Sequence, residues 1–136
     1  MTVARVTIMV NTRGPKGPLY DLNAIREAAS SEASFALTRG ARRDAENLGY
    51  SPDDVRGIVG RLQPSDYDHV WTKNDERGRP VLDADGEPIR MDVYLPTARN
   101  SEGRSDKIYL KVLLNKQLQP VAVVSVQSFH QPRKPV

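Results

Sequence analysis

The 136-residue sequence contains no cysteine, two histidines and a single tryptophan. The lack of cysteine excludes disulfides, thiolate zinc sites and cysteine nucleophiles together, and it fits a reducing compartment. Two histidines without cysteine also argue against a structural zinc site. We therefore expect a protein that uses neither a metal nor a cofactor, so that its chemistry comes from its own polar side chains.

Long apolar segments are also missing. The apolar run near the start, Val6 to Val10, is too short for the core of a signal peptide and far too short to span a bilayer. With 38% hydrophobic and 27% charged residues, the composition is that of a globular chain of one domain. We expect a cytoplasmic protein that has no membrane partner.

Positive charge is concentrated towards both ends of the chain, which carries a net charge of +3. Residues 104–136 hold six Lys and Arg residues against one acid, and residues 1–20 hold three against none. A basic segment that is also strand-like is the pattern that a nucleic-acid binder leaves in its sequence. Cations that merely solubilise an exposed face give the same pattern, so charge alone does not separate the two interpretations.

Start and stop signals predict helices in residues 21–63. Each helix has a candidate N-cap followed by apolar residues at helical spacing: Asp21, Thr38 and Ser51. The Ser51-Pro-Asp-Asp segment is the clearest start, and Pro64 ends the last helix. We interpret residues 33–37 as a short extended piece, and residues 1–20 as an N-terminal extension with room for an edge strand and a loop.

From residue 66 onward the hydrophobic period changes from helical to two, which predicts strands over residues 66–130. Residues 73–88 and 97–106 interrupt the alternation, and we interpret both as long loops, the first with a small ribbon at its base. The tail, residues 131–136, is expected to be loose. Helices first and strands second predict one α+β domain over residues 1–136, in which helices cover one face of a curved antiparallel sheet and no internal repeat occurs.

Two predicted strands, residues 89–95 and 107–114, place polar side chains opposite aliphatic ones. We expect the aliphatic face to pack on the helices and the polar faces to meet on one exposed surface. The polar set is Arg90, Asp92, Tyr94, Lys107, Tyr109 and Lys111. Fixed cations beside aromatic rings suit single-stranded RNA. A solvated sheet face shows the same alternation, because tyrosine is a good strand former.

His69 and His130 are the histidines of the sequence. Metal-free RNA cleavage needs a base for the 2′-hydroxyl proton, an acid for the leaving 5′-oxygen and a cation for the phosphate, and histidine moves protons near neutral pH. Either histidine is equally compatible with an ordinary surface position. Trp71 is more typical of a core or sheet-face residue than of a base-stacking platform. The Asp83–Glu87 segment lacks the ligands of a calcium loop and predicts a turn.

Ordered segments over about residues 20–130 resemble the MqsR family of toxins. These are Asp44-Ala-Glu-Asn-Leu-Gly49 with the helix that follows it, Ser65-Asp-Tyr67, Asp92-Val-Tyr-Leu-Pro96, Ile108-Tyr-Leu-Lys111 and Val123-Val-Ser125. The resemblance implies a RelE-like fold and a metal-independent endoribonuclease that cleaves mRNA, on the ribosome or free of it, and so inhibits translation. It also implies a cognate antitoxin protein that sequesters the toxin.

The family's active-site pattern is matched here by Tyr109. His69 and Met91 stand where the family has a lysine and a glutamine, and the family's last lysine falls near Gln127 or His130. Our catalytic candidates are His69, Tyr109 and His130, and our RNA-binding candidates are Arg90, Tyr94, Lys111, Lys73 and Lys107. The alternative is a non-catalytic RNA- or protein-binding module that retains the fold, which Met91 favours. A structural protein unrelated to nucleic acid is the third hypothesis.

Overall fold

A computed structural model of the chain describes residues 17–115 and 122–132. The edge strand expected before residue 17 and the tail after residue 132 lie outside these ranges. Within them, three helices precede most of the strands along the chain, so the prediction of an α+β protein is confirmed. None of the described helices is long and apolar enough to cross a membrane.

The helices start at the predicted capping residues: α1 (Leu22–Ala29), α2 (Arg39–Asn47) and α3 (Pro52–Gly60). Thr38 Oγ1 accepts the N–H of Ala41, and Ser51 and Asp54 exchange side-chain-to-backbone hydrogen bonds in a capping box. Asp21 precedes α1 but makes no capping bond with its side chain. Two short 3₁₀ helices, η2 (Glu32–Ser34) and η3 (Pro64–Asp66), introduce the first and second strands.

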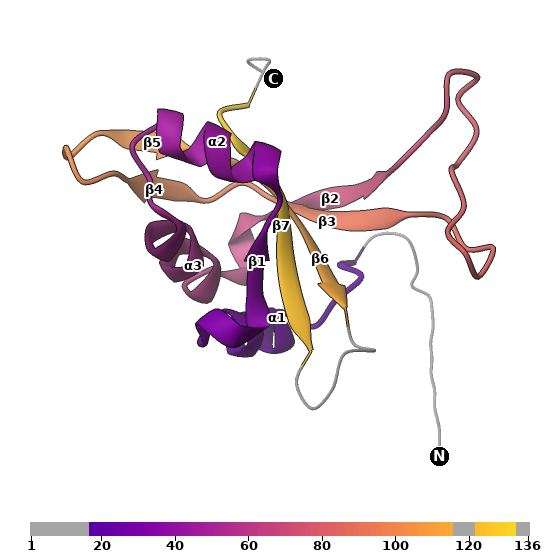
Figure 1. Ribbon diagram of the computed structural model, residues 1–136, viewed down its shortest axis with the longest axis horizontal. Coiled ribbons are helices and arrows are strands. Elements are labelled where there is room, and N and C mark those ends of the chain that lie inside the picture. The colour runs from indigo at the N-terminus through magenta and orange to yellow at the C-terminus, as the bar shows by residue number, and fades with distance from the viewer. Residues whose placement is uncertain (1–16, 116–121, 133–136) are drawn as a thin grey trace.

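A five-stranded sheet has the order β1-β7-β6-β3-β2 (Figure 1). Its strands are β1 (Phe35–Leu37), β7 (Val123–His130), β6 (Tyr109–Asn115), β3 (Arg90–Tyr94) and β2 (Tyr67–Thr72). Every neighbouring pair is antiparallel except β1 and β7, which are parallel. The prediction of a wholly antiparallel sheet is therefore wrong at this edge. No hairpin joins β1 to β7, because the rest of the chain lies between them, so nothing forces them to run in opposite directions.

The second predicted loop is a separate ribbon of two short strands, β4 (Thr97–Arg99) and β5 (Ser105–Lys107). Strands of three residues are too short to show an alternating pattern, which is why the sequence indicated a loop. The side chain of Asn100 closes the turn, since its Oδ1 accepts the backbone N–H groups of Glu102 and Arg104.

The phase of β3 relative to β6 decides which side chains face the helices. Asp92 pairs with Val112 and Tyr94 with Leu110, while Val93 pairs with Lys111. Tyr94 joins the core cluster that the helices form with one sheet face, whereas Val93 lies on the opposite face, outside that cluster. The expectation that Asp92 and Tyr94 share an exposed face with Lys111 is thus wrong. A one-residue difference in phase moves every side chain of a strand to the other face.

The segment between β2 and β3 forms an arm that projects away from the helices (Figure 1). It contains two turns eight residues apart, Asp75–Arg79 and Asp83–Glu87. In each turn the aspartate Oδ1 accepts two backbone N–H groups, at 2.9 and 3.0 Å, and the glycine has a φ of 80°. The expectation of no internal repeat is therefore wrong at this scale. The turn predicted at Asp83–Glu87 is confirmed, because the carboxylate of Asp83 accepts hydrogen bonds from backbone N–H groups.

Backbone hydrogen bonds also repeat at the base of the arm. The backbone N–H of Lys73 donates to the carbonyl oxygen of Ile89. The N–H of Ile89 donates to the carbonyl of Val81, and the N–H of Val81 donates to the carbonyl of Lys73, all at 2.8–3.0 Å. Three residues spaced by eight therefore close a ring of hydrogen bonds. The arm contains isolated bridges, Asn74 with Pro80 and Leu82 with Pro88, in place of the small ribbon expected at the base of this loop.

Candidate functional site

The sheet face opposite the helices collects all three predicted catalytic residues. We call it the open sheet face, and the cross-strand register assigns to it His69, Trp71, Met91, Val93, Tyr109, Lys111, Ser128 and His130. A β-bulge between Tyr67 and His69 sets this arrangement. It lets Tyr67 pack edge-on against Tyr94 on the core side while His69 pairs with Val93 on the open side.

Tyr109 and His130 form a stacked pair on the open sheet face. They are directly opposite one another on β6 and β7, and their rings stack with 5.0 Å between centroids and 8° between planes. Both side chains are partly exposed. The sequence could not indicate this pairing, because the two residues are 21 positions apart in the chain.

A backbone carbonyl orients the His130 ring. Nδ1 of His130 lies 2.7 Å from the carbonyl oxygen of Gln131, which only accepts hydrogen bonds. Nδ1 therefore carries the proton of the neutral ring, and the lone pair is on Nε2. A neutral imidazole in this tautomer is able to accept a proton from a ligand on the open sheet face.

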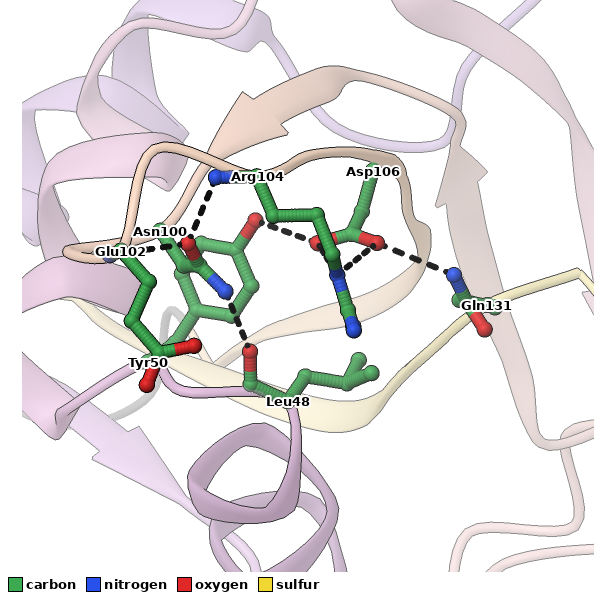
Figure 2. Close-up of polar contacts among 7 residues, drawn as sticks. All are labelled: Leu48, Tyr50, Asn100, Glu102, Arg104, Asp106 and Gln131. Atoms are coloured by element: carbon green, nitrogen blue, oxygen red, sulfur yellow. Dashed lines mark hydrogen bonds and ion pairs between the residues drawn. The ribbon is translucent and has the colours of Figure 1, made fainter.

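The side chain of Gln131 is fixed in turn by a polar cluster around Asp106 (Figure 2). Asp106 is buried, and its carboxylate accepts hydrogen bonds from Gln131 Nε2 at 3.0 Å, Arg104 Nε at 3.1 Å and the Tyr50 hydroxyl at 3.0 Å. Burial, followed by the hydrogen bond to Asp106, raises the pKa of Tyr50 to about 12. The cluster thus connects the β4–β5 ribbon to the end of β7, next to His130.

A second contact ties the ribbon to α2. Asn100 Nδ2 donates to the carbonyl oxygen of Leu48 at 3.0 Å (Figure 2). The neighbouring residue, Gly49, has a φ of 92°, and a Cβ there would lie 3.0 Å from Asn100 Nδ2. Glycine at this position therefore allows both the end of the helix and the close approach of the ribbon.

Lys111 lies across the face of Trp71. Its Nζ is 3.4 Å from the ring centroid, although the two residues belong to β6 and β2. Since β3 separates these strands, the lysine side chain must pass over the residues that β3 presents, Met91 and Val93. Both are buried although they lie outside the core cluster. Trp71 is not among the predicted site residues, although its position two residues after His69 on one strand indicates that the two share a face.

His69 stands at the outer strand of the open sheet face. Its Nδ1 lies 2.7 Å from Asp68 Oδ2, and both side chains are about half exposed. Three strand spacings separate β2 from β7, which places the backbones of His69 and His130 about 14 Å apart or more. The structure thus brings the two histidines to one face but not to one point.

The remaining predicted RNA-binding residues lie elsewhere. Tyr94 is 1% exposed and faces the core, so it offers no ring to a base. Arg90 pairs with Thr72 at the start of β3 and lies near Tyr20, on the side of Asp92. Lys107 is exposed on the β4–β5 ribbon, and Lys73 is exposed at the base of the arm.

Asp92 is buried beneath the start of the helical half. Its carboxylate accepts the backbone N–H groups of Leu19 at 2.8 Å and Tyr20 at 3.0 Å. Burial raises the pKa of Asp92, and the two hydrogen bonds act in the opposite direction. Asp92 therefore anchors the chain entering α1.

Two clefts of the described part of the chain lie away from the open sheet face. The first, of about 410 Å³, is lined by residues of η2, β1, α2 and α3, and the second, of about 450 Å³, includes residues of α3 and β4. No group of three or more potential metal ligands occurs among the residues that the structure describes. The open sheet face carries a tyrosine–histidine stack beside a lysine and an indole ring, which is suited to an extended ligand that lies along a surface.

Comparison with known proteins adds no family assignment. No protein-family model and no curated protein matches this sequence.

Proposed function

We propose that this chain is a metal-independent endoribonuclease that cleaves mRNA and inhibits translation, as the toxin of a toxin–antitoxin pair. The resemblance to MqsR toxins motivates this class of enzyme. The proposal includes what the same resemblance implies, namely a RelE-like fold, a cytoplasmic location and a cognate antitoxin as the protein partner. The observation that supports it best is the Tyr109–His130 stack. It puts two proton-carrying side chains side by side on an open surface that also carries a lysine.

The proposed reaction uses the tautomer of His130. Nε2 of His130 takes the proton of the ribose 2′-hydroxyl, and the 2′-oxygen attacks the adjacent phosphorus. The bond from phosphorus to the 5′-oxygen breaks, and the Tyr109 hydroxyl protonates that oxygen as it leaves. Lys111 stabilises the charge on the phosphate. The products are a 2′,3′-cyclic phosphate and a 5′-hydroxyl, so the step needs no water, metal or redox partner.

His69 has a different place in this proposal. An acid and a base that serve one phosphate must both come within hydrogen-bond distance of it, about 3 Å. The backbones of His69 and His130 are about 14 Å or more apart, whereas Tyr109 already stacks on His130. We therefore assign the chemistry to Tyr109 and His130, and we assign to His69 a contact with a neighbouring nucleotide.

The test is cleavage of single-stranded RNA by the purified chain in EDTA, with the end groups of the products identified. His130→Ala and Tyr109→Phe should each slow cleavage by about 10²-fold or more. Arg42→Ala is the matched surface control, because Arg42 is exposed on α2 and pairs only with Glu46 among the described residues. It should leave the rate unchanged. Full activity in both His130→Ala and Tyr109→Phe would refute the site.

One observation favours the second candidate, a module that binds RNA without cleaving it. β3 presents only Met91 and Val93 to the open sheet face, where the MqsR pattern has a glutamine. The same experiment separates the two candidates. Salt-sensitive RNA binding without any cleavage product would select the binding module, and cyclic phosphate ends would select the ribonuclease.

A further inference from the structure

The contact between Lys111 and Trp71 has a property that the proposed chemistry does not use. The ammonium group occupies the face of the indole ring, 3.4 Å from its centroid. Trp71 is partly exposed at the outer strand β2, next to His69 on the same face. This is the position where a nucleotide base would stack if the lysine were elsewhere.

A nucleotide brings both groups needed to open this contact. Its base has an aromatic surface that replaces the ammonium on the indole ring, and its phosphate attracts the displaced ammonium. Lysine is a flexible point charge on a four-carbon chain, so Nζ moves from the ring to a nearby phosphate without a backbone change. The exchange keeps Lys111 paired before and after binding.

We propose that Trp71 and Lys111 form a nucleotide subsite that Lys111 closes in the free protein and that single-stranded RNA opens by stacking a base on Trp71. The identity of the ligand rests on the proposed function. The subsite lies on β2, beside His69 and two strands from Tyr109, so it holds a nucleotide that flanks the cleaved bond. It gives the outer half of the open sheet face a role in substrate binding.

Trp71 is the only tryptophan of the chain, so its fluorescence reports on the subsite alone. The probe is a single-stranded oligonucleotide with 2′-O-methyl groups, which cannot be cleaved by 2′-hydroxyl attack. An abasic chain of the same length supplies phosphates without bases. The RNA should shift and quench the fluorescence and protect it from acrylamide, and the abasic chain should give no protection. Equal protection by both chains, or binding of the RNA with no change in fluorescence, would overturn the proposal.

Variants separate stacking from charge. Trp71→Ala should weaken RNA binding about tenfold or more and leave binding of the abasic chain unchanged, and Trp71→Phe should restore most of the loss. Lys111→Met keeps an apolar stem but removes the ammonium, so acrylamide should quench Trp71 more strongly in the free variant. Lys107→Met is the matched control on the β4–β5 ribbon and should not alter this quenching. A Trp71→Ala variant with wild-type affinity would refute the subsite.

The outcomes also separate this inference from the ribonuclease proposal. RNA-dependent protection of Trp71 in a protein that never cleaves RNA supports the subsite and refutes the ribonuclease. A Trp71→Ala variant that cleaves and binds RNA like the wild type supports the ribonuclease and refutes the subsite.

Discussion

Replacement of Tyr50 by Phe removes one interior hydrogen bond and leaves the aromatic ring in place. Tyr50 is 1% exposed, its ring packs edge-on against Phe129 with 5.3 Å between centroids, and its hydroxyl donates to Asp106 at 3.0 Å. A hydrogen bond to a charged group contributes about 1.5–3 kcal/mol. Asp106 keeps Arg104 and Gln131 as partners. We therefore expect the substitution to lower the free energy of unfolding by the lower end of this range, about 1.5 kcal/mol.

Tyr94 supplies a matched control for the same chemical change. It is also 1% exposed, and its ring packs edge-on against Tyr67 with 5.7 Å between centroids. Its hydroxyl, however, is buried and has no hydrogen-bond partner within the described part of the chain. Since an unsatisfied buried hydroxyl costs free energy, Tyr94→Phe should leave the free energy of unfolding unchanged or raise it by about 1 kcal/mol.

The assay is urea unfolding at neutral pH, followed by Trp71 fluorescence and by circular dichroism. With a slope of about 1–3 kcal/mol per molar urea, Tyr50→Phe should lower the midpoint by about 0.5–1.5 M, while Tyr94→Phe should hold or raise it. An equal loss of stability in the two variants would refute the reasoning. It would show that the hydroxyl groups matter through packing and not through their hydrogen-bond partners.

Further predictions concern four positions. Because burial raises the pKa of Asp92 above its ordinary 3.8, its contribution to stability is greatest below that pH and is lost as the pH rises through the folded-state pKa. The difference in unfolding free energy between the wild type and Asp92→Asn should therefore shrink as the pH rises. A difference that does not change with pH would contradict the burial of Asp92. Gly78→Ala, at a φ of 80° in open space, should cost about 1 kcal/mol in thermal unfolding. Gly49→Ala should cost clearly more, because its Cβ also displaces Asn100, and an equal cost would rule that contact out. In Asn100→Ala, the loss of three hydrogen bonds at the β4–β5 turn should raise amide exchange in the ribbon more than in β6.

The sequence predicted the helical half well because its signals are local. The capping residues Thr38 and Ser51 bond to backbone N–H groups three residues away, so the bonding partners lie within the same short segment. The parallel edge strand β1 carried no such signal. Its partner β7 is almost 90 residues later, and only the closed sheet reveals the direction of that pairing.

The candidate site was predicted in part, and the errors have one cause. Both faces of β3 are apolar enough to be buried, since Met91 and Val93 lie on one and Tyr94 on the other. The choice between them depends on Asp92, whose carboxylate is satisfied by the backbone of Leu19 and Tyr20, more than 70 residues away. Alternation within a single strand indicates which side chains share a face, but not which face meets the core.

The sequence indicates which residues of one strand share a face, but not which residues of different strands meet. Tyr109 and Lys111 share a strand and were predicted to share a face, which the register confirms. The stack of Tyr109 on His130 and the crossing of Lys111 to Trp71 depend on strand order, which the sequence did not indicate.

The repeated turns of the arm make its length adjustable in fixed steps. Lys73, Val81 and Ile89 are equivalent positions. A turn starts two residues after Lys73 and two residues after Val81, and Ile89 directly precedes β3. Removal of residues 75–82 would leave the Asp83–Glu87 turn to close directly on Lys73, with the same bonds that now close the first turn. An eight-codon duplication would lengthen the arm just as simply. A gene for this protein is therefore able to change how far the arm reaches in one event, while β2 and β3 keep their register and the open sheet face stays as it is.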